Sequence, residues 1–514
     1  MRNKLLPFIC LAALAVVPQF SAAQSSTLPA FITDSLDGYI NRALVEWNIP
    51  GAAVAIVKGD HVVVSKGYGV TEAGGTQPVD AHTLFMIASN VKAFTGTTMA
   101  MLEYDSLCSL SDKVTKWLPE FSLYDPATTR QATLRDLLAH NLGYSTFQGD
   151  WLYFYSTLRP EDIYASYALM KPPYGIREKY GYSNIGYFFA GECIRNISGM
   201  GWETCLQRKI LDPLEMDRTL LTSKDLASQR NVAWGHTLEN GAMKKFPHTN
   251  IDLIGAAAGM SSTANDLSHW LIAQLNEGTF GGARVIPAAV IEKTRTPVTL
   301  IGRNQHIYNS THYELYGLGW SLEDYEGKEV VSHSGGIWGF VSSVSFMPEL
   351  GLGIVILTNT DENWFYEALK WEITDAFLGL PYRNYSGEYL KIFRNRADAK
   401  ALTESRWLEA TTDTFPGGLT AKEYSGTWSN DLYGKIEITA TQEGLQVTYE
   451  HHPGMRSVLK PMRDGSFLCV HSPSRWGTFR LETGKDPEGR LYIDFRVADR
   501  LDRGTYRFGK VTAF

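Results

Sequence analysis

A serine and a lysine three residues apart open an apolar stretch of this sequence, IASNVKAFTGTTMAML at residues 87–102. On a helix, the i, i+3 spacing places the Ser89 hydroxyl and the Lys92 amine on one face. Lys92 is the only charged residue of the stretch, and desolvation among apolar neighbours lowers the pKa of an amine. A neutral amine within hydrogen-bond reach can accept the serine proton. The pair therefore predicts a nucleophile and its base.

The same spacing also arises by chance. Ser457 and Lys460 repeat it in a region rich in alternating strands, where residues three apart point to opposite faces. The Ser89 copy differs because it opens an apolar helix, whose free N–H groups and dipole favour negative charge on an attacking oxygen. A pattern this short still needs support from other parts of the chain.

Two further stretches supply that support. The first is Tyr182-Ser183-Asn184, within KYGYSNIGYFFAGECI, and the second is His333-Ser334-Gly335-Gly336, at the edge of a predicted strand. Taken singly, these residues would be a core tyrosine, a turn histidine and ordinary turn glycines. Taken in order, Ser-x-x-Lys, Tyr-x-Asn and a basic-x-Gly strand resemble the serine β-lactamase and penicillin-binding-protein superfamily. The best match is its class C-like branch, which also contains esterases and D-amino-acid peptidases.

The resemblance covers roughly residues 30–380 and implies roles for the matching positions. Ser89 would be the acylated nucleophile, Lys92 its base, and Tyr182 a second base or a proton shuttle. The oxyanion hole would consist of the backbone N–H groups of Ser89 and Gly336, and Asn184 would donate to a substrate carbonyl. The implied substrate-binding and oxyanion positions are Asn184, His333, Ser334, Gly335 and Gly336.

One departure from the family pattern bears on the substrate. Many β-lactamases and wall transpeptidases carry Lys-Thr-Gly where this chain has His333-Ser334-Gly335. A histidine is only partly charged at neutral pH, so it suits the carboxylate of a penicillin less well than a lysine does. We therefore expect a small ester, an amide or a peptide as substrate. Two alternatives stay open, a true β-lactamase and a catalytically inactive module that binds cell-wall peptides.

The elements expected to position these residues indicate an α+β fold. A helix is predicted over residues 31–47, and GAAVAIVKGDHVVVSKGYGV forms a strand pair around Gly59-Asp60. A middle region, about 85–320, mixes helical patterns with aromatic loops. Three strands over 328–359 and a helix near 363–380 follow. This order predicts an antiparallel sheet flanked by helices, with a helical subdomain, over residues 24–385.

The last part of the chain has a different pattern. Residues 386–418 are polar and helix-prone and are interpreted as a linker. From 419 to 514, short alternating segments such as KIEITA and LQVTYE are broken by Gly and Asp turns. This pattern predicts a separate β-sandwich or small barrel. It resembles the lipocalin-like domain that follows the hydrolase domain in some members of the superfamily.

The remaining features concern location and partners. Residues 1–23 have a basic start, an apolar run and a small-residue end, which predicts a signal peptide and export to the periplasm or the medium. A net charge of −7 without a basic run argues against nucleic-acid binding. The sequence predicts no metal, cofactor or membrane span in the mature chain, and it leaves the oligomeric state open. The cysteines outside the signal peptide show no metal-ligand spacing and no compelling disulfide: Cys108, Cys193, Cys205 and Cys469.

Overall fold

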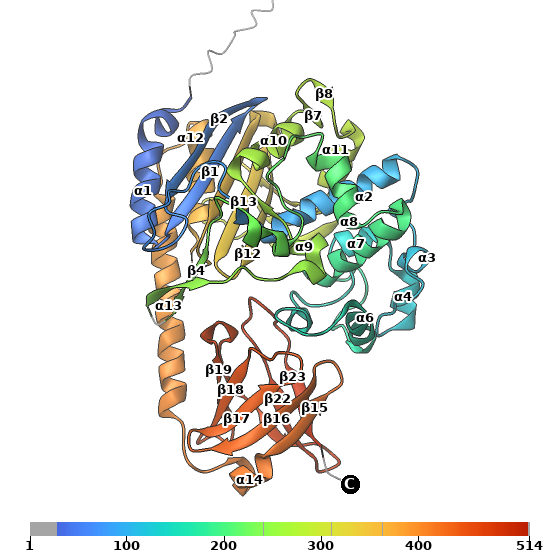
Figure 1. Cartoon of the computed structure of the whole chain (residues 1–514), viewed down its shortest axis with the longest axis vertical. Helices are drawn as coiled ribbons and strands as arrows, with labels where there is room; N and C mark the ends of the chain where they lie inside the picture. The colour runs from blue at the N-terminus through green and yellow to red at the C-terminus, as the bar shows by residue number, and fades with distance from the viewer. Residues whose placement is uncertain (1–27, 240, 310, 362, 512–514) are drawn as a thin grey trace, which may run out of the picture.

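The chain forms an α+β part and an all-β part, joined along one side by a long helix (Figure 1). The computed structural model describes residues 28–239, 241–309, 311–361 and 363–511. The predicted signal peptide lies outside these ranges. Within them, no helix combines the length and the apolar composition that crossing a bilayer requires.

An antiparallel sheet of eight strands forms the middle layer of the α+β part. Its central strands are buried on both faces: Val54 and Ile56 of β1 pack toward one layer of helices, and Ala55 and Val57 toward the other. The pairing of Val54 with Ile356 joins the first strand to the last strand of this sheet, so both ends of the α+β part meet at its centre. In spatial order the strands are β2 (His61–Gly69), β1 (Gly51–Lys58), β14 (Leu352–Thr358), β13 (Phe340–Met347), β12 (Lys328–Ile337), β11 (Ser321–Tyr325), β10 (Tyr313–Tyr316) and β9 (Thr299–Arg303).

The predicted architecture is confirmed, and the sheet contains three further strands: β11, directly before the three expected ones, and β9 and β10. The hairpin around Gly59 and the three strands over 328–359 are present as expected. Strands β9 and β10, however, lie in the middle region that the sequence assigned to helices and aromatic loops. Their sequences, TLIGR and YELY, are short and only partly buried, so no run of alternation marks them. Pairing along the sheet edge defines them instead.

Two layers of helices cover the sheet. Helices α1 (Leu36–Glu46) and α12 (Phe365–Leu378) share a core with one face. Helices α2 (Val91–Tyr104) and α10 (Ala264–Leu275) lie on the other face and begin the helical subdomain (Figure 1). The remaining elements of this part are α3 (Val114–Trp117), α4 (Pro126–Gln131), α5 (Leu134–Leu138), α6 (Pro160–Leu169), α7 (Asn184–Ser198), α8 (Trp202–Leu206), α9 (Gly255–Ala258) and α11 (Ala288–Arg295), with the short strand pairs β3 (Phe85–Met86) and β6 (Ser261–Ser262), β4 (Gly235–Glu239) and β5 (Ala242–Phe246), and β7 (Thr279–Phe280) and β8 (Ala283–Arg284).

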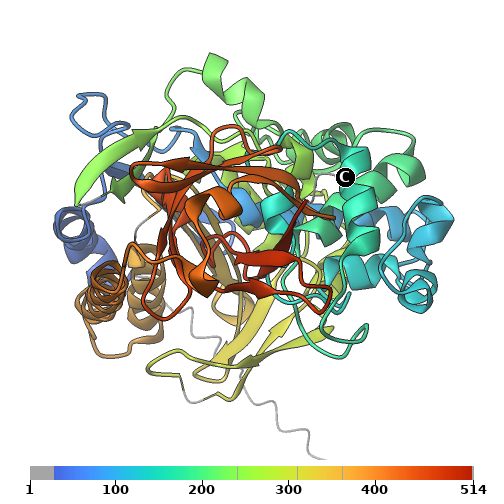
Figure 2. The same ribbon diagram turned by 90° about the horizontal axis from the view of Figure 1, so that it is seen from below.

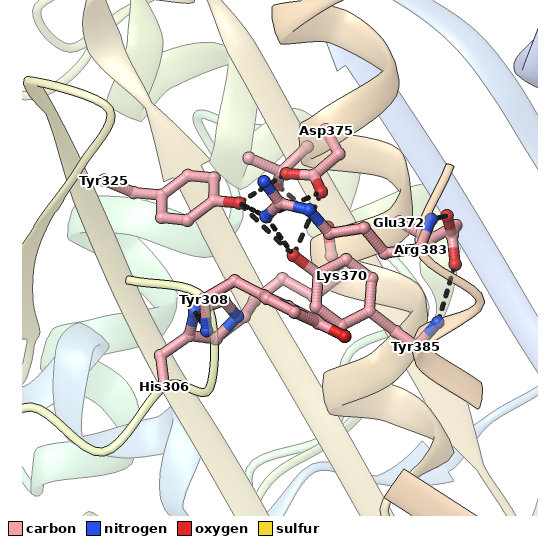
Figure 3. Close-up of polar contacts among 9 residues, drawn as sticks. His306, Tyr308, Tyr325, Lys370, Glu372, Asp375, Arg383 and Tyr385 are labelled. Atoms are coloured by element: carbon pink, nitrogen blue, oxygen red, sulfur yellow. Dashed lines mark hydrogen bonds and ion pairs between the residues drawn. The ribbon is translucent and has the colours of Figure 1, made fainter. Parts of the chain in front are cut away.

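Most of the segment interpreted as a linker is one helix, α13 (Tyr385–Glu409), and a buried polar network anchors its start (Figure 3). The Asp375 carboxylate on α12 accepts hydrogen bonds from the hydroxyls of Tyr325, at 2.6 Å, and Tyr385, at 3.0 Å. The Arg383 guanidinium lies 3.4 Å from the same carboxylate and donates to both hydroxyls. Because these charges and hydroxyls satisfy one another, the start of α13 is tied firmly to α12.

The all-β part is a curled sheet of nine antiparallel strands that approaches a barrel. Its first and last strands in spatial order, β20 and β21, are separated in the chain by Glu482 alone, so the sheet returns on itself. Seen from below, the all-β part, drawn in orange and red, lies in front of the centre of the α+β part (Figure 2). The elements, after helix α14 (Ala421–Tyr424), are β15 (Gly426–Asn430), β16 (Gly434–Thr441), β17 (Gly444–Tyr449), β18 (Arg456–Pro461), β19 (Phe467–Ser472), β20 (Thr478–Leu481), β21 (Thr483–Lys485), β22 (Leu491–Phe495) and β23 (Tyr506–Lys510).

Candidate active site

Ser89 lies at the mouth of helix α2, in the single 3₁₀ turn Ala88–Asn90. Ala88, directly before it, has φ of +45°, a left-handed conformation that is strained for a residue with a Cβ. Strand β12 presses on this turn, since a Cβ at Gly335 would lie 2.1 Å from the Ile87 carbonyl oxygen. Glycine at 335 is therefore required for the close approach that holds the Ser89 turn against the sheet.

The Lys92 amine is completely buried and points at the serine. Its Nζ lies 3.0 Å from Ser89 Oγ, 2.6 Å from Asn184 Oδ1 and 3.0 Å from the Ala257 carbonyl oxygen. Burial lowers its pKa to about 7, and the carboxyl of Asp150 opposes that shift. A neutral amine has two N–H groups, which can donate to Asn184 Oδ1 and to the Ala257 carbonyl oxygen. Its lone pair can then accept the proton of the Ser89 hydroxyl.

Tyr182 reaches the same pair from the segment before α7. The Lys92 Nζ lies 4.7 Å from the centre of its ring, and its hydroxyl is hydrogen-bonded to Ser89. Burial raises the pKa of Tyr182 well above the usual range of a phenol. The hydroxyl is therefore protonated at neutral pH, which suits a group that passes a proton on more than one that acts as a phenolate base.

His333 on β12 is buried and electrically neutral. Burial, with a smaller effect from Lys92, lowers its pKa to about 3. Its Nδ1 lies 2.6 Å from the Ser334 carbonyl oxygen, which can only accept, so Nδ1 carries the proton. Nε2 then accepts from the Tyr316 hydroxyl at 3.1 Å. No cation therefore occupies the position where Lys-Thr-Gly relatives carry their lysine.

Beyond His333, the outer edge of β12 faces the site. Strand β11 pairs with β12 only from Lys328 to Ser332, whereas β13 pairs with it as far as Ile337. Gly336 lies in this one-sided stretch, and no neighbouring atom would come within 4 Å of a Cβ built on it. The backbone there has room for the extended chain of a substrate.

A cavity of about 430 Å³ opens at these residues. Each predicted site residue except Lys92 lines it, and Lys92 lies buried behind Ser89. Arg500 and Leu501, in the loop between β22 and β23, line it as well, so the β-part closes one side. The other walls are largely aromatic or apolar, among them Phe147, Phe154, Tyr180, Ile251, Tyr316, Ile337, Trp338, Trp364 and Tyr366.

The sequence analysis did not identify Asp150, a buried carboxyl group near Lys92. Asp150, 1% exposed, accepts a hydrogen bond of 2.6 Å from Asn184 Nδ2, so the Asn184 amide is engaged on both sides, by Lys92 and by Asp150. Burial, reinforced by the nearby charge of Asp502, raises the pKa of Asp150 well above its ordinary value. Asp150 lies in FQGDWLYF, where no motif distinguishes it.

The four described cysteines are all free.

The chain belongs to the beta-lactamase family, whose model matches residues 36–377. Members of this family are serine hydrolases. The chain is 27% identical over 436 residues to Unguisins hydrolase ungD of Aspergillus violaceofuscus, covering 78% of this chain and 76% of that protein. It is 28% identical over 338 residues to Protein flp of Staphylococcus aureus, covering 64% and 63%.

Two solved structures share the fold. The octameric penicillin-binding protein homologue from Pyrococcus abyssi matches with a TM-score of 0.58 and 21% identity, over 92% of this chain and 99% of that one. A D-stereospecific amidohydrolase from Streptomyces sp. matches with a TM-score of 0.52 and 23% identity, over 63% of this chain and 93% of its own. Coverage of 92% of this chain means that the first match extends into the β-part.

Proposed function

We propose that this protein hydrolyses amides, peptides or small esters through an acyl-enzyme on Ser89. The observation that carries the proposal is the buried Lys92 amine, 3.0 Å from the Ser89 hydroxyl and with its pKa lowered to about 7, at the wall of an open cavity. Neutral Lys92 takes the serine proton as Oγ attacks the substrate carbonyl. The N–H groups of Ser89 and Gly336 stabilise the oxyanion, each typically contributing about 2.7–4 kcal/mol.

Tyr182 then delivers a proton to the leaving group. It remains protonated at rest, lies beside Lys92, and is hydrogen-bonded to Ser89, so a proton taken by Lys92 has a short path to the leaving atom. In the second half-reaction the same groups activate water, which attacks the acyl carbon and releases Ser89. In both steps the proton moves among Ser89, Lys92 and Tyr182, which lie side by side in the site.

The cavity supports an amide or peptide substrate with an apolar side chain. Its walls are largely aromatic or apolar, and the neutral His333 offers no charge to a carboxylate at the position where β-lactamases carry lysine. A solved structure with this fold is called an amidohydrolase, and a curated relative is called a hydrolase. We therefore infer poor turnover of β-lactams.

Covalent labelling tests the proposal. A fluorophosphonate probe is expected to label the wild type and to leave Ser89→Ala unlabelled, with intact mass giving one adduct per chain. Absence of labelling by both the fluorophosphonate and a fluorescent penicillin would favour the alternative of a binding module. In a panel of p-nitrophenyl esters, D-amino-acid amides, D-Ala-D-Ala peptides and nitrocefin, esters or amides are expected to turn over and nitrocefin barely. Rapid nitrocefin hydrolysis would contradict the inference from His333.

We also infer export, on the composition of residues 1–23. Expression in a bacterial host is expected to yield a periplasmic or secreted chain that begins near residue 24, as measured by mass spectrometry. A chain that retains residue 1 and stays in the cytosol would contradict this inference.

A further inference from the structure

The β-part grips the loop that carries Asp150. The Asp502 carboxylate accepts hydrogen bonds from the backbone N–H groups of Gly149, at 3.0 Å, and Trp151, at 3.3 Å. From the same part, His452 Nε2 donates to the Trp151 carbonyl oxygen at 2.8 Å. Two N–H groups and one carbonyl of a three-residue turn are thus satisfied by residues about 300 or more positions later in the chain.

Asp502 is itself firmly placed. It is completely buried and accepts from the hydroxyls of Tyr433, at 3.1 Å, and Tyr506, at 2.8 Å. The Trp151 ring stacks on Tyr433 with centres 4.5 Å apart, which closes the contact to water. A buried carboxylate with this many donors is a rigid anchor, because each donor would otherwise lose a partner.

From this anchor, a continuous chain of contacts leads to the base. Asp502 holds the turn, the Asp150 side chain on that turn accepts from Asn184 Nδ2 at 2.6 Å, and Asn184 Oδ1 accepts from Lys92 Nζ at 2.6 Å. We propose that Asp502 is a positioning residue for catalysis, acting on Lys92 through Asp150 and Asn184. The inference rests on the proposed function, in which Lys92 is the base.

The charges along this series of contacts predict a specific change in the pH dependence of labelling. The Asp502 charge helps to raise the pKa of Asp150, and an ionised Asp150 raises the pKa of Lys92. Removing the Asp502 charge therefore favours ionised Asp150, raises the pKa of Lys92 and leaves less neutral amine at a given pH. The other titratable groups facing these three are His140, Tyr153, Tyr167, Tyr182, Tyr187, His333, Tyr433 and Tyr506.

The test compares three variants of the full chain with the wild type. Asp502→Asn removes the charge and keeps the shape, Tyr506→Phe removes one hydrogen-bond donor to Asp502 and keeps the carboxyl group, and Asp499→Asn is the control. Asp499 lies on the same loop but is exposed and paired with Arg496. The measurements are the pH profile of the fluorophosphonate labelling rate and the hydrogen exchange of residues 149–152.

In Asp502→Asn, the acid limb of the profile is expected to move up by roughly half a pH unit or more, which lowers labelling at pH 6 about threefold or more. Exchange of residues 149–152 is expected to rise in Asp502→Asn and Tyr506→Phe, and the acid limb is expected to stay unmoved in Asp499→Asn. An acid limb in Asp502→Asn that coincides with the wild-type limb overturns the inference. A wild type that is not labelled at all defeats the proposed function instead, so the two failures are separate.

Discussion

Replacement of Lys92 by methionine tests the proposed base most directly. Methionine has a similar length and is apolar, so Lys92→Met keeps the packing of a fully buried site and removes only the amine. An ordinary lysine, with a pKa near 10.4, is neutral in only roughly 0.04% of molecules at pH 7, whereas a pKa of about 7 makes about half of them neutral. Burial thus provides a neutral base in about a thousandfold more molecules.

The size of the expected loss follows from this role. Loss of a positioned general base typically slows reaction by about 10²–10⁴-fold, and we expect that range for fluorophosphonate labelling of Lys92→Met. In the wild type, the labelling rate should fall about tenfold from pH 8 to pH 6, because the neutral fraction of an amine with a pKa of about 7 falls from roughly 90% to 10%. Protonation inactivates the base, so the labelling rate decreases as the pH falls.

The assay is the second-order rate of labelling, followed by gel fluorescence and intact mass, with folding checked by circular dichroism. Lys66→Met is the matched control, because Lys66 is an exposed lysine of β2 that pairs with Asp37. A folded Lys92→Met variant that labels within threefold of the wild type, or a wild-type rate that is flat between pH 6 and pH 8, would refute the role of Lys92.

Three further changes test the framework of the site. Gly335→Ala should lower the free energy of unfolding by about 1–3 kcal/mol and weaken labelling, because its Cβ would strike a backbone carbonyl oxygen. Gly336→Ala, in contrast, should unfold like the wild type. Equal thermal melting temperatures for the two variants would contradict this prediction. Trp151→Ala should cost about 3–5 kcal/mol in urea unfolding, since its ring is buried between the two parts of the chain; a loss below 1 kcal/mol would show that this contact is not tight. Asp375→Ala should lower the free energy of unfolding by about 3–5 kcal/mol, because it leaves a guanidinium and two hydroxyls without their acceptor (Figure 3). The folded fraction should still be labelled at Ser89. Loss of labelling without loss of stability would refute a purely structural role for Asp375.

Local patterns in the sequence were sufficient to predict several elements of this protein. The spacing of Ser89 and Lys92 works because the 3₁₀ turn that holds Ser89 continues directly into α2, so residues three apart lie on one face. The central strands are marked by their own apolar residues. The order of the three motifs was sufficient to predict the family that the model match confirms. Strands β9 and β10 were missed because their pairing, not their composition, defines them.

The chemistry of the site depended on contacts between distant segments. Lys92 becomes a candidate base only because α7 and α9 close over it and exclude water, and no local pattern reports that desolvation. Asp150 and Asp502 lie 352 positions apart, and their meeting depends on how α13 carries the β-part back across the cavity. Sequence spacing encodes neighbours within one helix or strand, whereas the path of the chain through space determines which buried charges face one another.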